Sequence, residues 1–147
     1  MADAPDPLKL DAMLCFAVYA AGHAFTRFYK PRLDALGLTY PQYLVFLVLW
    51  EGDGLTVKAL GDKLFLDSGT ITPMIKRLEA RGLLSRARDE KDERQVRVTL
   101  TEAGRALREQ ALSVPLAVSM ALGGNPSDGD ALRESLHLLR ERLDASA

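Results

Sequence analysis

The chain has 147 residues, of which 48% are apolar and 27% charged, and its formal net charge is −1. This size and balance predict one globular domain and exclude collagen-like and low-complexity sequence. The first residues are not a basic region followed by an apolar run, and no segment approaches roughly 18 consecutive apolar residues. We therefore expect a cytoplasmic protein that does not enter a membrane.

Charge is distributed unevenly along the chain. Residues 1–57 and 106–147 each hold four basic against six acidic side chains, whereas residues 58–105 hold eleven basic against eight acidic. A local set of basic side chains binds phosphate by releasing counterions even when the whole protein is nearly neutral. The basic centre is consistent with nucleic-acid binding, and equally with a solvated charged face.

A long first helix is predicted by the helical spacing of apolar residues between Leu8 and Leu36. Pro31 lacks an amide donor and should kink this helix or restart it near Lys30. A second helix should run from Pro41 to about Trp50, because Thr39-Tyr40-Pro41-Gln42 has the form of a capping box.

Two shorter helices are predicted next, from Val57 to Leu64 and from Ser68 to Arg81. Thr56 and Asp67 are their expected N-caps, and Gly82 should close the second in a left-handed conformation. Two helices a few residues apart are typical of a helix-turn-helix when the second starts with small hydroxyl side chains and carries basic ones further along.

A β-hairpin is predicted after Gly82, where the period changes from helical to alternating. Its strands are Leu84-Ser85-Arg86-Ala87-Arg88 and Gln95-Val96-Arg97-Val98-Thr99-Leu100, joined by a charged tip. The three apolar residues of the second strand share one face. A hairpin that follows a helix-turn-helix is a wing.

A further helix should begin at Glu102, with Thr101 as its cap, and bend at Pro115. The run Gly123-Gly124-Asn125-Pro126 should end it. This helix lies outside the predicted helix-turn-helix and wing.

The last helix is expected to open at Ser127 with Asp130 and to run to about Leu143. It carries an apolar stripe of four leucines: Leu132, Leu136, Leu139 and Leu143. One interpretation is packing onto its own domain. We favour an interface between two copies, since the first and last helices would otherwise expose apolar faces outside the winged core.

The stretch Asp92-Glu93-Arg94-Gln95-Val96-Arg97-Val98-Thr99-Leu100-Thr101-Glu102-Ala103-Gly104 resembles the wing and following helix of the multiple-antibiotic-resistance regulator (MarR) family. The family pattern is Asp-x-Arg, an apolar strand and Leu-Thr-x-x-Gly. Three other segments resemble the organic hydroperoxide resistance regulators of that family. They are Leu14-Cys15-Phe16, Tyr29-Lys30-Pro31 leading to Thr39-Tyr40-Pro41-Gln42-Tyr43-Leu44, and Leu66-Asp67-Ser68-Gly69-Thr70-Ile71-Thr72-Pro73-Met74.

The resemblance implies a mainly α winged helix-turn-helix fold with a small β-hairpin wing. It also implies a homodimer in which Cys15, the single cysteine, is held by the hydroxyls of Tyr19, Tyr29 and Tyr40, some from the partner subunit. Hydrogen-bond donors favour the thiolate, which a peroxide oxidises to a sulfenic acid. Phe16 would make the pocket apolar and favour an organic hydroperoxide.

Two features of the residues limit this hypothesis. From the residues alone, Cys15 is also consistent with a buried, inert core cysteine, and spacing places only Tyr19 on its helix face. With no second cysteine, the sulfenic acid must be capped by a low-molecular-weight thiol or a backbone nitrogen, or oxidised further. His23, His137 and the cysteine lie on separate elements, so we expect no metal site and no cofactor.

For double-stranded DNA, the expected contacts come from the second helix of the helix-turn-helix and from the wing. The family counterpart of Arg94 enters the minor groove, and Asp92 should orient the wing. Arg86 is a phosphate candidate, with solvated surface as an equally plausible interpretation. The remaining candidates reach bases or phosphates from the helix: Ser68, Thr70, Thr72, Lys76 and Arg77.

The sequence thus predicts a single domain over residues 1–147, with a DNA-binding lobe at about 55–100 and dimerisation helices at about 8–36 and 102–145. We expect a non-enzymatic repressor that binds a pseudo-palindromic operator when reduced and leaves it when an organic hydroperoxide oxidises Cys15. One alternative is a related repressor that binds a small aromatic ligand, with Cys15 incidental. Another is a thiol peroxidase, which a lone cysteine without a neighbouring base disfavours.

Overall fold

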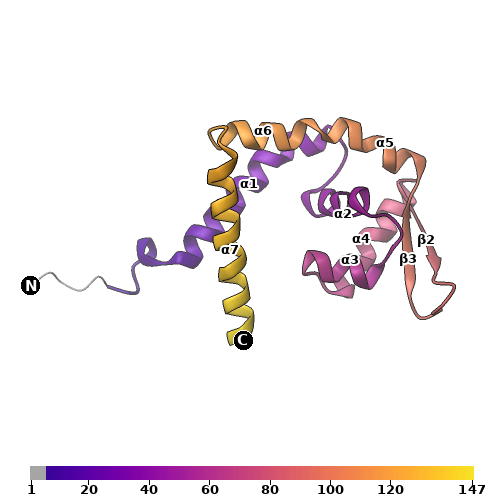
Figure 1. Cartoon of the computed structure of the whole chain (residues 1–147), viewed down its shortest axis with the longest axis horizontal. Coiled ribbons are helices and arrows are strands. Elements are labelled where there is room, and N and C mark those ends of the chain that lie inside the picture. Colours follow the sequence, from indigo (N-terminus) through magenta and orange to yellow (C-terminus); the bar gives the residue numbers. More distant parts are fainter. Residues whose placement is uncertain (1–5) are drawn as a thin grey trace, which may run out of the picture. The chain divides into compact units, whose positions relative to one another are not determined.

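The computed structural model describes residues 6–147 and consists of helices and a small antiparallel sheet (Figure 1). This part of the chain forms two compact units, one reaching to Gln110 and one spanning Ala111–Ala147. The elements in chain order are η1 (Leu10–Ala12, a 3-10 turn), α1 (Leu14–Asp34), α2 (Tyr40–Glu51), β1 (Leu55–Thr56), α3 (Val57–Leu64), α4 (Ser68–Ala80), β2 (Leu84–Arg88), β3 (Val96–Leu100), α5 (Glu102–Ala111), α6 (Ser113–Ala121) and α7 (Pro126–Ser146).

Helix α1 begins at Leu14, whereas the apolar pattern predicted a helix from Leu8. Met13 has an extended backbone (φ −85°, ψ 110°), which separates the 3-10 turn from the helix. The helix then continues through Pro31 to Asp34, so the predicted restart before the proline is wrong. Pro31 lies in the last turn, where its missing amide removes a single backbone bond.

The predicted N-caps of α2, α3 and α4 are confirmed. At α2, the Gln42 amide donates to Thr39 Oγ1 (3.3 Å), and the Thr39 amide donates to Gln42 Oε1 (3.0 Å), which completes the capping box. Thr56 and Asp67 each accept a bond from the amide three residues further on, at 3.1 and 2.8 Å. Each bond satisfies an amide that has no partner inside its helix, which fixes where the helix starts.

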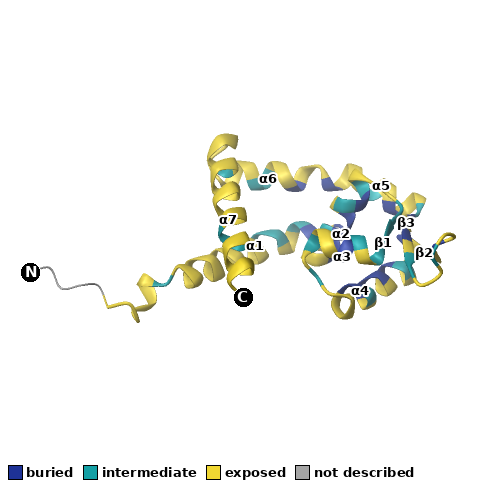
Figure 2. Ribbon diagram, turned by 60° about the horizontal axis from the view of Figure 1, so that its bottom comes forward, coloured by how far each residue is buried: buried dark blue, intermediate teal, exposed yellow. Residues whose placement is uncertain are grey.

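The core of the first unit is formed mainly by α2, α3, α4 and the sheet, where Figure 2 shows the buried residues concentrated. Apolar spacing on α3 and α4 directs one face of each helix inward, whereas α2 is apolar nearly all round. The fully buried side chains of these elements are Val45, Phe46, Leu49, Leu60, Ile71, Ile75, Leu78, Leu84 and Val98.

The sheet has the strand order β1-β3-β2, and β2 pairs with β3 in the register Leu84↔Leu100. This hairpin is the predicted wing. Strand β1, which pairs Leu55 with Val98, was not predicted because two residues carry no alternation to detect. The β2–β3 hairpin therefore has a third strand along one edge, which ties it to the chain just before α3.

The junction between β3 and α5 depends on a glycine. Thr101 Oγ1 accepts from the Gly104 amide (3.2 Å), which confirms the predicted cap, and Trp50 Nε1 donates to the Gly104 carbonyl (3.0 Å). A Cβ atom at Gly104 would lie 2.2 Å from the Leu83 carbonyl oxygen. The glycine of the Leu-Thr-x-x-Gly pattern is therefore required by backbone approach.

The helix predicted from Glu102 is interrupted at Leu112, so that α5 ends at Ala111 and α6 begins at Ser113. The interruption lies one turn before Pro115, whose missing amide leaves the Ala111 carbonyl without its helical partner. The predicted opening of the last helix is wrong. The cap of α7 is Asn125, which accepts from the Ser127 amide (3.1 Å), so Ser127 and Asp130 do not open it. The proline that follows Asn125 occupies the first position of α7, where no amide donor is needed. None of the described helices combines the length and hydrophobicity that a membrane crossing requires.

Candidate functional site

The N-terminal half of α4 presents polar side chains on the face that does not enter the core. Ser68 and Thr70 are exposed and Thr72 is half-buried, and one to two turns later Lys76 and Arg77 are exposed. The Asp67 cap fixes the first turn, so these hydroxyl groups are held on a rigid backbone.

A groove of about 510 Å³ runs between α3, the start of α4 and the wing. Ser68 and Thr72 of α4 line one side of it, and Arg86 and Arg94 line the other. The groove thus brings together four of the side chains that the sequence predicted for DNA, from two segments far apart in the chain.

The two wing arginines differ in exposure and in partner. The Arg94 side chain is 91% exposed, and its Nε lies 3.1 Å from Asp92 Oδ1. The Asp92 carboxylate also accepts from the Arg94 amide (3.1 Å), so Asp92 orients both the backbone and the guanidinium. Arg86 is half-buried, and its guanidinium and its amide both donate to Glu79 of α4. Arg86 therefore joins the wing to α4, and Arg94 projects into solvent.

Cys15 lies in the first turn of α1 and is exposed in the single chain, so the buried-core interpretation is wrong for this chain on its own. Tyr19, one turn further along, contacts the His23 ring with 4.3 Å between centroids and lies 6.4 Å from Phe16. Phe16 itself is 39% exposed. The thiol is thus flanked by aromatic side chains of its own helix.

A tyrosine cluster lies at the other end of α1. The ring centroids of Tyr29 and Tyr40 are 4.9 Å apart, and Tyr43 lies 6.0 Å from Tyr29. Tyr29 and Tyr40 line a pocket of about 450 Å³ together with Thr26, Lys30, Leu33, Asp34, Leu38, Thr39 and Pro41. The structure thus brings Tyr29 and Tyr40 together, but on α1 Tyr29 follows Cys15 by about 21 Å of helix rise.

Burial raises the pKa values of these phenols. It raises the pKa of Tyr29 to about 12, with smaller contributions from Tyr40 and Tyr43. Burial also raises the pKa of Tyr40, and burial followed by Tyr40 raises the pKa of Tyr43. At neutral pH all three hydroxyls carry a proton, and those of Tyr29 and Tyr40, which line the pocket, can donate it there.

Sequence reasoning placed His23 on a different element from Cys15, which is wrong because both lie on α1. It did not single out Tyr43, although the aromatic spacing of Tyr40 and Tyr43 was a usable signal. It also missed a bond from Arg81 Nη1, at the end of α4, to the Gly37 carbonyl (2.5 Å) in the turn before α2. Among residues 6–147, no group of three or more His, Cys, Asp or Glu side chains is placed to hold a metal ion.

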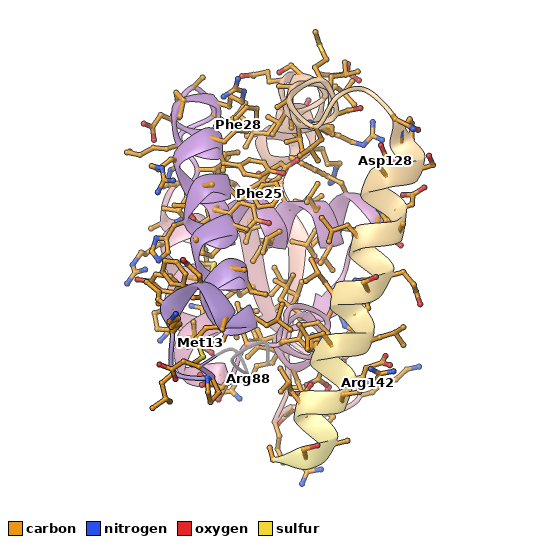
Figure 3. The ribbon with its side chains drawn as sticks, turned by 90° about the vertical axis from the view of Figure 1, so that its left-hand side faces the viewer. Met13, Phe25, Phe28, Arg88, Asp128 and Arg142 are labelled. Carbon is orange, nitrogen blue, oxygen red and sulfur yellow. The ribbon has the colours of Figure 1, made fainter. Side chains whose placement is uncertain are left out.

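Apolar side chains remain exposed along α1 and α7. Figure 3 shows the side chains of α1, with Met13 before its start and Phe25 and Phe28 further along. Phe25 is 41% exposed, and α7 has no buried residue. The other large exposed apolar residues of these two helices are Leu14, Phe16, Val18, Tyr19, Leu132, Leu136, Leu138 and Leu143.

Three comparisons with known proteins show similarity to transcriptional regulators. Residues 27–110 match the family of the transcriptional regulator SarA/Rot. The HTH-type transcriptional regulator TtmR of Methylorubrum extorquens (strain PA1) is 53% identical over 97% of this chain and 73% of its own length. The organic hydroperoxide resistance transcriptional regulator of Bacillus subtilis (strain 168) is 47% identical over 94% of this chain and 94% of its own.

Among solved structures, that of reduced AbfR of Staphylococcus epidermidis bound to DNA is similar, with a TM-score of 0.80 and 38% identity. The match covers 92% of this chain and 93% of that one. These relatives are named as transcriptional regulators, and the similar structure was solved bound to DNA. This chain therefore belongs to the MarR family of winged helix-turn-helix transcriptional regulators, in the group of the organic hydroperoxide resistance regulators.

Proposed function

We propose that this regulator is a homodimeric repressor that binds operator DNA when Cys15 is reduced and leaves it when an organic hydroperoxide oxidises Cys15. The observation that carries the proposal is the exposed Cys15 at one end of α1, with a pocket lined by Tyr29 and Tyr40 at the other. The name of the Bacillus subtilis relative supports the choice of oxidant.

The thiol site of the proposed dimer is shared between subunits. About 21 Å of helix separates Cys15 from Tyr29 in one chain, so hydroxyls of this pocket reach only the thiol of another chain. Two α1 helices that pair antiparallel about a two-fold axis bring each Cys15 to the partner subunit's tyrosine pocket. The exposed apolar residues of α1, such as Leu14 and Val18, support such pairing.

The chemistry at this site is a two-electron oxidation. The Cys15 thiolate attacks one peroxide oxygen, the O–O bond breaks, and the alkoxide that leaves takes up a proton, which gives an alcohol and a sulfenic acid. The protonated hydroxyls of Tyr29 and Tyr40 donate to the thiolate before attack. With no second cysteine in the chain, a low-molecular-weight thiol then condenses with the sulfenic acid and releases water.

A short path links this pocket to α4. Leu38, Thr39 and Tyr40 line the pocket, and Gly37, the residue before them, accepts a bond from Arg81 at the C-terminal end of α4. A rearrangement of the α1–α2 turn around an oxidised thiol is thereby passed to the helix that reads DNA. Release then follows because the two α4 helices no longer match half-sites about one helical turn apart.

On DNA, the start of α4 and the wing make different contacts. The hydroxyls of Ser68, Thr70 and Thr72 reach phosphates or base edges in the major groove, and Lys76 and Arg77 neutralise phosphate. Arg94, whose side chain is 91% exposed, enters the minor groove with Asp92 behind it.

The test is fluorescence anisotropy with duplex DNA from upstream of the protein's own gene. Reduced protein should bind, and cumene hydroperoxide should weaken binding by at least about tenfold, with recovery in dithiothreitol. Cys15→Ser keeps the size and loses the nucleophile, so it should bind equally well and ignore the peroxide. Release of Cys15→Ser by the peroxide would contradict the proposal. Release of wild type by salicylate, with the thiol still reduced, would favour the ligand-responsive alternative.

A further inference from the structure

One acidic side chain in the wing is buried, although its strands are short and solvent-exposed on one face. Asp89 follows β2 directly and is 8% exposed. It accepts from the Lys91 amide (2.8 Å) and from Arg97 Nη2 (2.5 Å). The Lys91 amide and then the Arg97 side chain hold the pKa of Asp89 below its usual range. Asp89 is thus a charged, fully partnered group at the base of the wing loop.

Arg97 continues the connection to a distant segment. It lies on the outer face of β3, and its Nη1 donates to the carbonyl of Gly54, in the turn before β1. The same turn is fixed by Asp53, whose Oδ1 accepts from the Leu100 amide (2.9 Å). One guanidinium therefore joins the wing loop to the chain that enters the helix-turn-helix.

Backbone bonds carry this connection to the wing tip. The Asp89 amide donates to the Gln95 carbonyl (2.9 Å), and the Gln95 amide donates to the Asp92 carbonyl (2.9 Å). Asp92 in turn holds the amide and the guanidinium of Arg94. The tip is a closed loop, and the position of Arg94 depends on where Asp89 is anchored.

The anchor lies outside the hydrophobic core. Val98 and Leu100 fill the inner face of β3, whereas Arg97 is on the opposite face with its side chain 47% exposed. The Arg97 end of the pair is open to solvent, whereas the Asp89 side chain is only 10% exposed and keeps its bond from the Lys91 amide when Arg97 is lost. Loss of the Asp89–Arg97 pair should leave the strands and the core intact, so its main effect falls on the geometry of the tip.

We propose that Asp89 and Arg97 are positioning residues that set the depth and direction of Arg94 in the minor groove, and with them the preference of the wing for A·T base pairs. This inference rests on the proposed operator binding. Arg97 acts through Arg94 and makes no required contact of its own with DNA.

The experiment is a double-mutant cycle measured by anisotropy on the upstream duplex with reduced protein. Arg94→Ala should weaken binding by at least about fivefold, and Arg97→Met by about threefold. In the Arg94→Ala background, Arg97→Met should add less than about a factor of 1.5. Arg133→Met, which removes the same charge from an ion-paired arginine in α7, serves as the matched control and should leave affinity unchanged.

Asp89→Asn distinguishes a role of Asp89 in positioning Arg94 from the repulsion between its negative charge and DNA. Removing a negative charge near DNA strengthens binding if electrostatics alone act, whereas loss of the anchor weakens it. We expect weaker binding by about two- to threefold, a reduced preference for A·T over G·C at the wing base pairs, and a melting temperature within a few degrees of wild type.

Three results would overturn the inference. They are tighter binding by Asp89→Asn, an undiminished effect of Arg97→Met in the Arg94→Ala background, or an unchanged A·T preference in both single variants. If Arg94→Ala itself binds like wild type, the wing contact of the proposed function fails with it. Peroxide-induced release, measured separately on the same variants, tests the thiol mechanism independently of the wing.

Discussion

The segment from α2 to the start of α5 and the terminal helix α7 differ in how much of their apolar surface the chain itself covers. In the first, the α2, α4 and β3 side chains Phe46, Ile75 and Val98 are completely buried. In α7 no residue is buried, although its leucines form a continuous stripe. The winged part is therefore complete within one chain, and the stripe of α7 has the character of a surface that another chain covers.

The largest expected effect comes from a substitution in the core of the winged part. Phe46 is 0% exposed, so Phe46→Ala should lower the free energy of unfolding by about 3–5 kcal/mol. Phe25→Ala on α1 is the matched control, because Phe25 is 41% exposed and should cost less than about 1 kcal/mol at low protein concentration. Urea unfolding followed by circular dichroism gives both values. Equal losses would show that the exposed face of α1 is covered within one chain as fully as the winged core.

The second effect tests the stripe of α7. Leu136→Glu places a charge among the leucines and should raise the dimer dissociation constant by at least about tenfold, or about 1.4 kcal/mol. His137→Glu adds the same carboxylate outside the stripe and is the control. Analytical ultracentrifugation measures both, with circular dichroism to confirm that the winged part stays folded. A Leu136→Glu protein that dimerises like wild type would remove α7 from the interface.

The third effect tests the tyrosine pocket, which α1 and α2 line and to which the proposed dimer brings the partner's thiol. Tyr29→Phe and Tyr40→Phe each remove one donor and should slow alkylation of Cys15 at neutral pH by up to about tenfold, equivalent to about 1.4 kcal/mol. Tyr43→Phe is the control, because Tyr43 does not line the pocket. Alkylation rates that match wild type in Tyr29→Phe and Tyr40→Phe would make these tyrosines packing residues only.

The smallest expected effect is a change in how the free energy of unfolding depends on pH above 10. The pKa of Tyr29 is raised to about 12 from 10.0, so between these values the unfolded chain loses a proton that the folded chain retains. Stability linked to this group is complete below pH 10 and is lost as pH rises through the window. In Tyr29→Phe the loss of unfolding free energy from pH 10 to 12 should be shallower. Superimposable pH profiles would contradict the assignment.

Local signals explain how much of the fold the sequence predicted. The caps at Thr39, Thr56 and Asp67 lie within three residues of their partners, and α2, α3 and α4 were placed to within about a residue. Predictions were wrong where two local signals compete, as at α7, where Asn125 followed by proline overrides Ser127. Strand β1 was missed because it exists only through its pairing with β3.

The candidate site also has parts that the sequence predicted and parts that only the folded structure reveals. Resemblance grouped Tyr29 with Tyr40, and the structure places their rings 4.9 Å apart. The Arg97–Gly54 contact joins positions 43 residues apart, and no periodicity or cap signals a bond set by the register of β3. The pairing of Cys15 with any tyrosine of the cluster stays a prediction, because it needs a second chain.

In the proposed dimer, the length of α1 also determines that two sensor sites form and that each takes residues from both subunits. In that dimer, Cys15 near the start of α1 and Tyr29 towards its end belong to different sites, so each subunit gives its cysteine to one site and its tyrosines to the other. Two differently damaged subunits therefore complement each other: a mixed dimer of Cys15→Ser with Tyr29→Phe retains one intact site. In a cell that expresses both genes, such mixed dimers should respond to peroxide faster than Tyr29→Phe alone, whereas Cys15→Ser alone should not respond.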